Sequence, residues 1–151
     1  MGRLTGSTHM NAQDVADRLA IHDLLARYCH AIDQQRWNDL RALFADDARV
    51  DFTAFGGPRG DADMLIAFLR PVVEGLAGTY HSTTSIMCDL DGDRATVRSA
   101  AHVVMSSKGP NGGEQHNHVG LWYEDELARA DTGWCFASRT QKRAWVDAVA
   151  S

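Results

Sequence analysis

Two residues of the sequence have side chains that could transfer a proton together. Asp33 ends a segment with helical spacing, and His81 opens the polar run HSTTS. A neutral imidazole is the side chain best suited to take or give a proton near pH 7. If the Asp33 carboxylate reached the ring, it would fix the tautomer and stabilise the imidazolium. The pair would then be a base that removes a proton from carbon or oxygen in a dry cavity.

Both residues also have a structural interpretation. An aspartate at a helix end can anchor a loop, and buried carboxylates without partners are rare and costly. A single histidine on a strand can belong to the core. Strict alternation along the strand gives the face of His81 these neighbours: Thr79, Thr83, Ser85 and Met87. That mixture of polar and apolar side chains is typical of a ligand pocket, so both interpretations stay open.

Three further residues could assist such a base. Tyr28 is a possible phenolic donor, but it lies about 140° from Asp33 around an ideal helix. The two reach one pocket only if the pocket is broad or the helix unwinds. Arg139 and Arg143 share a face of the last strand and could bind a carboxylate or a leaving anion. Their alternative is an ordinary solvated strand surface.

The string HNH at 116–118 indicates a rival kind of site. His116 and His118 point to one face of a strand, where such a pair can chelate a metal, and His102 could join from the neighbouring strand. A cupin-like iron site would need a carboxylate a few residues later, and Glu124 fits that spacing poorly. We therefore expect no metal.

The spacing of apolar residues predicts the elements that must position these side chains. Helices are expected at 13–33, 37–45 and 61–76, and strands at 48–55, 79–90, 94–107, 115–128 and 134–145. Helices at the front and an antiparallel meander at the back indicate an α+β fold. Because a twisted sheet curls around helices on one face, a cone-shaped pocket should remain between the two layers.

Composition limits the class of protein. The 151 residues, 44% hydrophobic and 23% charged, suit one soluble domain. Residues 1–10 read as an expression leader, which leaves a single domain at 11–151. The net charge of −5 and the lack of basic runs argue against nucleic acid. No apolar run has membrane length, so we expect no membrane partner and a cytoplasmic protein. The three cysteines are widely spaced, which favours reduced thiols.

Four blocks in order resemble the SnoaL-like branch of the NTF2-like superfamily. They read YCHAIDQQRWNDLRALFADDARVDF, TYHSTTS, DGDRATVRS and GLWYEDELARADTGWCFASRT. The pattern covers about residues 13–145 and is most similar to the group of scytalone dehydratase, bile-acid 7α-dehydratase and lindane dehydrochlorinase. The resemblance implies a cone in which a curved antiparallel sheet of four to six strands wraps around about three N-terminal helices.

The resemblance also implies roles for individual residues. In that group a helix-end aspartate pairs with a histidine of the first long strand, which matches Asp33 and His81. Tyr28 would match an acid or substrate-positioning group, and Arg139 or Arg143 an arginine that helps the leaving group. The chain departs from the pattern at Phe52, where the dehydratases have a tyrosine, and His102 has no secure counterpart in the family.

The implied activity is cofactor-free acid/base catalysis. A dehydratase, which is a lyase, is the first expectation, with an isomerase or a polyketide cyclase as alternatives that begin with the same proton abstraction. The substrate would be small, apolar and cyclic, like a steroid or polyketide. The expected pocket walls are Phe44, Phe52, Phe55, Phe68, Met87, His102, Val119 and Trp122, with Arg139 and Arg143.

A non-catalytic class of function remains open beside the enzyme. Many domains of this fold bind a ligand or another chain. A sheet face bearing Trp122, Tyr123, Trp134 and Phe136 would be the interface. By resemblance to the dehydratase group, we expect a homo-oligomer, either a trimer or a dimer.

Overall fold

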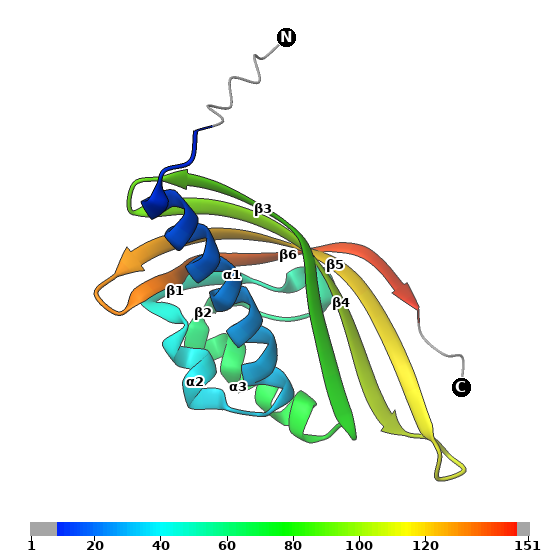
Figure 1. Cartoon of the computed structure of the whole chain (residues 1–151). Coiled ribbons are helices and arrows are strands. Elements are labelled where there is room, and N and C mark those ends of the chain that lie inside the picture. The colour runs from blue at the N-terminus through cyan, green and yellow to red at the C-terminus, as the bar shows by residue number, and fades with distance from the viewer. Residues whose placement is uncertain (1–8, 148–151) are drawn as a thin grey trace.

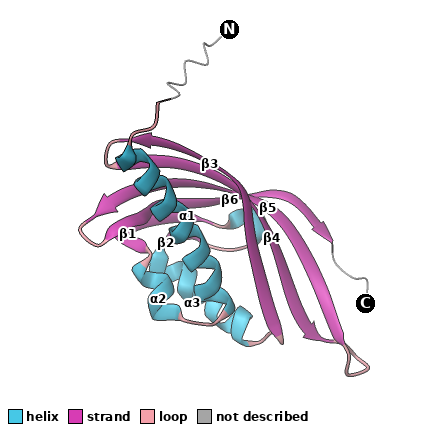
Figure 2. Cartoon of the chain, viewed as in Figure 1, coloured by secondary structure: helices cyan, strands magenta, loops and turns pink. Residues whose placement is uncertain are grey.

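The computed structural model describes residues 9–147, so most of the expected leader and the last four residues lie outside the described part. The elements are shown in Figures 1 and 2. In chain order they are α1 (Ala12–Asp33), α2 (Trp37–Ala42), β1 (Phe44–Asp51), the 3₁₀ turn η1 (Thr53–Phe55), β2 (Arg59–Asp61), α3 (Ala62–Glu74), β3 (Gly78–Asp91), β4 (Arg94–Lys108), β5 (Glu114–Ala130) and β6 (Gly133–Asp147).

One curved sheet carries the fold, with strand order β2-β1-β6-β5-β4-β3. Strands β3 to β6 form the expected antiparallel meander, and β1 joins β6 in parallel. All three helices lie on the concave side of the sheet (Figure 1). The α+β cone predicted from the sequence is confirmed. No helix within residues 9–147 is both long and apolar enough to cross a membrane.

Local sequence signals set the helix starts. Asn11 and Asp14 form a capping box at the start of α1, and the Asp61 carboxylate accepts the Met64 N–H at the start of α3. The inner face of α1 buries Ile21, Leu25 and Ile32 against the sheet. That packing determines where the end of α1 lies on the sheet, and Asp33 is the last residue of the helix.

An ion pair between the buried Asp17 and the exposed Arg129 ties the other end of α1 to the sheet. Asp17 accepts hydrogen bonds from both terminal nitrogens of Arg129 at 2.8 Å and from Trp134 Nε1 at 3.1 Å. Hydrogen bonding to Arg129 lowers the pKa of Asp17 well below its usual range, despite the opposing effect of burial. The helix is therefore held to β5 and β6 at one end and to β3 at the other.

Three elements differ from the sequence prediction. The strand expected at 48–55 ends at Asp51, and residues 53–55 form the 3₁₀ turn η1 instead. Helix α2 ends at Ala42, because Phe44 already pairs with Phe136 as the first residue of β1. Asp46 and Asp47, expected to end the helix, are exposed strand residues on a part of β1 that β2 does not cover. The three-residue strand β2 was not predicted, since the Gly-Gly-Pro sequence before it reads only as a turn.

A β-bulge interrupts β3 after its polar run. Ser85 has φ +51°, and the register with β4 shifts between Thr84 and Met87. A bulge adds one residue to a strand and so reverses which face the following side chains occupy. The face of His81 therefore does not continue to Met87, as strict alternation had predicted.

Candidate active site

The site is centred on the contact between α1 and β3. The Nδ1 atom of His81 lies 2.6 Å from Oδ1 of Asp33. The other carboxylate oxygen accepts the backbone N–H of His81 at 2.9 Å, and Thr79 Oγ1 donates to Oδ1 at 3.0 Å. The side chains are 10% exposed for His81 and 19% for Asp33. Three donors from one strand therefore hold this carboxylate.

The carboxylate of Asp33 is destabilised by the dipole of its own helix and stabilised by hydrogen-bond donors of β3. The negative end of the helix dipole disfavours a carboxylate at the last residue of α1. The hydrogen bonds from Thr79 and His81 offset that cost. The helix then stops at once, because Gln35 adopts φ +54°.

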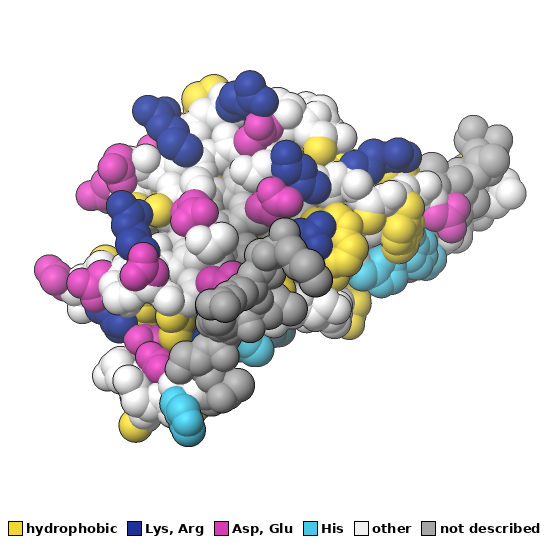
Figure 3. Space-filling view, turned by 90° about the horizontal axis from the view of Figure 1, so that it is seen from above, with side chains coloured by type: hydrophobic (Ala, Val, Ile, Leu, Met, Phe, Trp, Pro, Cys, Tyr) yellow, Lys and Arg dark blue, Asp and Glu magenta, His cyan; other side chains and the backbone are white. Residues whose placement is uncertain are grey.

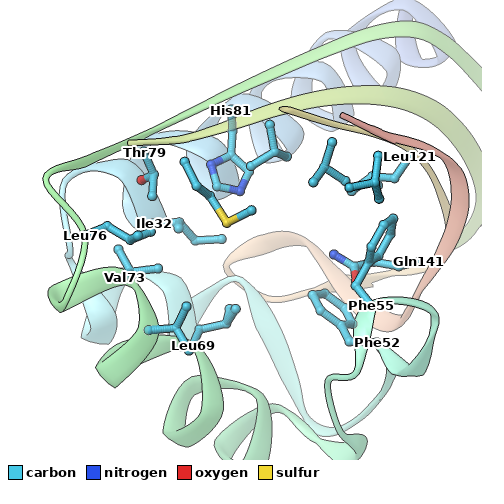
Figure 4. A pocket seen from close by; sticks show the side chains of 15 residues that line it. Ile32, Phe52, Phe55, Leu69, Val73, Leu76, Thr79, His81, Leu121 and Gln141 are labelled. Carbon is cyan, nitrogen blue, oxygen red and sulfur yellow. The ribbon is translucent and has the colours of Figure 1, made fainter. Parts of the chain in front are cut away.

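The imidazole of His81 projects into a cavity of about 340 Å³ between the sheet and α3 (Figure 4). The lining residues are Ile32, Phe52, Phe55, Leu69, Val72, Val73, Leu76, Thr79, His81, Val103, Met105, Val119, Leu121, Gln141 and Val146. None of them is charged. The cavity is therefore an apolar space with very few polar groups on its wall.

Two of its three polar side chains are already engaged. The Thr79 hydroxyl donates to Asp33, and the Nδ1 atom of His81 is bound to the same carboxylate. A hydrogen on Nδ1 leaves Nε2 with its lone pair, which is the form of a neutral base. What remains to meet a ligand is Nε2 of His81 and the amide of Gln141.

The loop after β1 closes one side of the cavity. Phe52 precedes η1, Phe55 is its last residue, and both line the cavity. Gly57 comes so near that an added Cβ would lie 2.9 Å from the Phe52 backbone oxygen, so a glycine is needed there. The loop thus holds two aromatic rings against the ligand space.

Of the predicted wall residues, Phe52, Phe55 and Val119 line the cavity, and Phe68 and Met87 do not. Phe68 lies on the outer side of α3, where its ring packs toward Gly57 and stays partly exposed. Met87 is 58% exposed because the bulge in β3 carries it away from the face of His81. Both assignments assumed an uninterrupted periodicity.

His102 and Trp122 were also predicted to line the cavity, and that prediction is wrong. Their neighbours Val103 and Leu121 line the cavity, so by alternation His102 and Trp122 face the convex side of the sheet. There His102 Nε2 lies 2.9 Å from Nδ1 of His118. Among residues 9–147 no three potential metal ligands come together.

The predicted helpers Tyr28, Arg139 and Arg143 do not line the cavity either. Arg143 is exposed. Tyr28 and Arg139 are buried in the core, where the guanidinium carbon lies 4.0 Å from the Tyr28 ring centroid and 3.5 Å from that of Tyr123. Phe44 is buried in the same aromatic cluster, 6.3 Å from Tyr28. Burial raises the pKa of Tyr28 well above its usual value, which suits a structural phenol.

Arg139 is paired with a second buried charge. Asp125 lies opposite it on β5, with 3.5 Å between Arg139 Nε and Asp125 Oδ1, and both side chains are inaccessible. Burial raises the pKa of Asp125 to about 7, although the nearby Arg139 charge opposes that rise. The guanidinium of Arg139 thus lies in the buried core and not at the cavity, where a leaving group would be.

The aromatic interface predicted from the sequence mixes two faces of the sheet. Tyr123, Trp134 and Phe136 are buried in the core, and only Trp122 faces the convex side. The convex face exposes other residues instead, chiefly Trp145 near the two histidines, 5.7 Å from the His102 ring. Figure 3 shows histidine and hydrophobic side chains side by side toward one end of the molecule.

Gln141 is the site residue that the sequence analysis missed. It lies between Arg139 and Arg143 on the last strand, and roles were predicted for those two charged residues instead. The signal that would have found it is the alternation itself, which places Gln141 on the same face as Arg139. In the structure its amide points into the cavity from β6 (Figure 4).

A family model and several relatives match the chain. The model of the SnoaL-like domain matches residues 13–140. The uncharacterized proteins Rv2910c of Mycobacterium tuberculosis and Mb2934c of Mycobacterium bovis are each 31% identical to it, over 89% of this chain and 90% of theirs. These matches extend over nearly all of the described residues.

Solved structures share the fold at lower identity. A protein from Novosphingobium aromaticivorans, provisionally named scytalone dehydratase, superimposes with a TM-score of 0.82 at 21% identity, over 94% of this chain and 93% of its own. A type 2 hexachlorocyclohexane dehydrochlorinase, LinA, gives a TM-score of 0.76 at 19% identity, over 90% of both chains. At such identities the likeness is one of fold.

Proposed function

Because the chain belongs to the SnoaL-like domain family, we propose that it is a cofactor-free enzyme that removes a proton from a small, apolar, cyclic substrate. The observation that carries this proposal is the pairing of Asp33 with Nδ1 of His81, whose ring faces a half-open apolar cavity. A dehydratase is the first candidate. The names of two neighbours in fold, a scytalone dehydratase and a dehydrochlorinase, support elimination as the reaction type.

The proposed reaction begins at Nε2 of His81. This atom takes a proton from a carbon of the substrate, and the electrons of the C–H bond form the new double bond. The leaving group departs from the neighbouring carbon with its bonding pair. If that group is a hydroxyl, the imidazolium returns its proton to the departing oxygen and water leaves. Asp33 stabilises the imidazolium meanwhile.

The cavity supports a compact, neutral substrate. Its volume of about 340 Å³ lies at the lower end of the range common for small-molecule sites. An apolar wall also lowers the local dielectric, which strengthens the interaction of Asp33 with a protonated His81. An isomerase or a cyclase would use the same base, and the choice depends on what the substrate places beside the proton.

Turnover on a panel of ligands tests the proposal. The protein would be incubated with small cyclic alcohols, ketones and chlorides, and loss of water or HCl would be followed by mass spectrometry. His81→Asn should abolish turnover while ligands still raise the melting temperature. The outcome against the proposal is a variant that turns over substrate at the wild-type rate. Ligand binding with no turnover by the wild type would favour the binding-domain alternative.

We also propose that the chain forms a homo-oligomer through the convex face of the sheet. Trp145 is 45% exposed there, and Tyr80 of β3 is 60% exposed. Single exposed aromatics are ordinary, but a tryptophan beside two stacked histidines forms a broader apolar surface. Light scattering of the wild type and of Trp145→Arg would test this face, since the variant should shift the mass toward the monomer.

A further inference from the structure

The cavity has one polar side chain that the proposed proton transfer does not use. Gln141 stands on β6, and His81 and Thr79 stand on β3 across the ligand space (Figure 4). The other lining residues are apolar. A half-buried amide in such a wall forms favourable contacts only if its N–H or C=O groups meet a polar partner.

A neighbouring phenol holds one side of that amide. Tyr123 lies directly opposite Gln141 on β5, and side chains in such pairs are in contact distance. Hydrogen bonding with Gln141 and Tyr28 limits the rise of the Tyr123 pKa that burial causes, so the three side chains form a polar row. A hydrogen bond that lowers the pKa of a phenol is one that its oxygen accepts, so Gln141 donates one N–H to Tyr123. Figure 4 shows the amide nitrogen, which carries a second N–H, on the cavity side.

The positive charge of Arg139, next to this row of side chains, also favours a hydrogen-bond donor at the end of the row that faces the cavity. The Arg139 guanidinium lies over the Tyr123 ring, two cross-strand pairs further along the sheet on the same face. A cation on that side attracts electron density away from the cavity along the hydrogen-bonded side chains. The end that faces the ligand is then best suited to an oxygen that gains negative charge.

The cavity wall does not suit a charged ligand. No lining residue carries a formal charge apart from a protonated His81. The Asp33 carboxylate is bound to His81 and Thr79, and Arg139 is enclosed in the core. A ligand carboxylate would lose its hydration without gaining a counter-charge, which is costly.

We propose that Gln141 is the anchor for a carbonyl oxygen and that the substrate class is a neutral cyclic ketone. This inference rests on the proposed function and deepens it. His81 takes the proton from the carbon next to the carbonyl. The C–H electrons form an enolate, whose oxygen accepts a hydrogen bond from the Gln141 amide. The enolate then expels a group from the next carbon or regains a proton from His81.

Three probes of similar size test the proposal on the whole chain. They are 1-tetralone, which has the carbonyl and acidic protons, tetralin, which lacks the oxygen, and tetralin-1-carboxylate, which carries a charge. Calorimetry gives their affinities. Proton NMR in D₂O gives the exchange of the protons next to the carbonyl of 1-tetralone. The wild type should bind the ketone at least tenfold more tightly than tetralin, should not bind the carboxylate, and should accelerate the exchange.

Gln141→Met keeps the size of the side chain and removes its donor. It should bind the ketone and tetralin equally, leave the affinity for tetralin unchanged, and slow the exchange about 100-fold. Gln141→Glu, which keeps the shape, should lose the preference for the ketone as well and covers the case in which the first variant does not fold. His81→Asn should keep the preference for the ketone and lose the exchange.

These variants separate the two proposals. An unchanged preference for the ketone in both Gln141 variants would overturn the anchor, whether or not His81 is the base. Failure of the wild type to prefer 1-tetralone to tetralin, or tight binding of the carboxylate, would overturn it too. A preference that depends on Gln141, without any exchange that depends on His81, would support the anchor and count against the proposed function.

Discussion

The carboxylate of Asp33 lies 2.6 Å from Nδ1 of His81, although 48 positions separate the two residues in the chain. Asp33 is the last residue of helix α1, and His81 lies near the start of β3. The same carboxylate oxygen accepts the hydroxyl of Thr79, which stabilises its orientation. This geometry supports the proposed base and gives the following tests.

Loss of the Asp33 charge should disable the base without unfolding the protein. Asp33→Asn keeps the size of the side chain, but an amide neither stabilises the imidazolium nor fixes the tautomer that leaves Nε2 free. We expect turnover to fall about 10²- to 10⁴-fold. Asp23→Asn is a matched control, since Asp23 is an exposed residue of the same helix paired only with Arg27. Equal turnover in the two variants would contradict the role of Asp33.

Filling the cavity should block ligands and leave the fold intact. Val103 lines the cavity, and its neighbour Val104 faces the convex side of the sheet. Val103→Phe should weaken binding of 1-tetralone at least tenfold, whereas Val104→Phe should leave it unchanged. Calorimetry on both variants, with circular dichroism as a check of the fold, measures this. Normal binding to Val103→Phe would place the ligand elsewhere.

The buried Asp125 should make stability depend on pH. Burial raises its folded-state pKa to about 7, while in the unfolded chain it titrates near 4. Between pH 4 and pH 7, Asp125 is protonated in the folded state and ionised in the unfolded state. Its contribution to the free energy of unfolding is therefore fully present below pH 4. It is lost as pH rises through 7. Urea unfolding from pH 5 to 9 should show this decline for the wild type.

Asp125→Asn should flatten that decline, because an amide does not titrate. A decline of the same size in the variant would assign the pH dependence to another group. Arg139 is fully buried against Asp125, so removal of the arginine is not a clean control. The asparagine variant keeps the size of the side chain and removes the titrating group. It also leaves Arg139 without its counter-charge, so the slope of stability against pH, and not the stability itself, is compared with the wild type.

The ion pair at the start of α1 should contribute to stability rather than to catalysis. Asp17 is nearly inaccessible and accepts hydrogen bonds from Arg129 and Trp134. Asp17→Ala leaves the buried Trp134 donor without its acceptor, whereas Arg129 is exposed and keeps Asp93, and we expect a loss of about 2 kcal/mol in the free energy of unfolding. Asp23→Ala, which breaks an exposed pair of the same helix, should cost less than about 0.5 kcal/mol. Denaturant titration measures both.

The sequence predicted the long elements because local patterns determine them. Helical spacing ran to Asp33, and the Asp91-Gly92-Asp93 turn predicted the hairpin whose first strand carries His81. The assignment of the pair itself also drew on the family resemblance. The contact between the two residues depends on where α1 rests on the sheet, which no local pattern gives.

The errors came from features that alternation cannot show. The bulge at Ser85 moved Met87 to the other side of the strand. Arg139 has the sequence signature of a surface charge, yet the sheet curves over it and buries it against Asp125. Gln141 was overlooked because an amide between two arginines carries no chemical signal until the cavity around it is known.

Proton exchange measures the central claim most directly, since the claim is that His81 removes a proton from a ligand in the cavity. A cyclic ketone that raises the melting temperature would be incubated in D₂O with the wild type and with His81→Asn, and its acidic protons would be followed by NMR. We predict rapid exchange with the wild type and only the background rate with the variant. Equal exchange with both proteins, or no exchange of any bound ketone, would contradict the account.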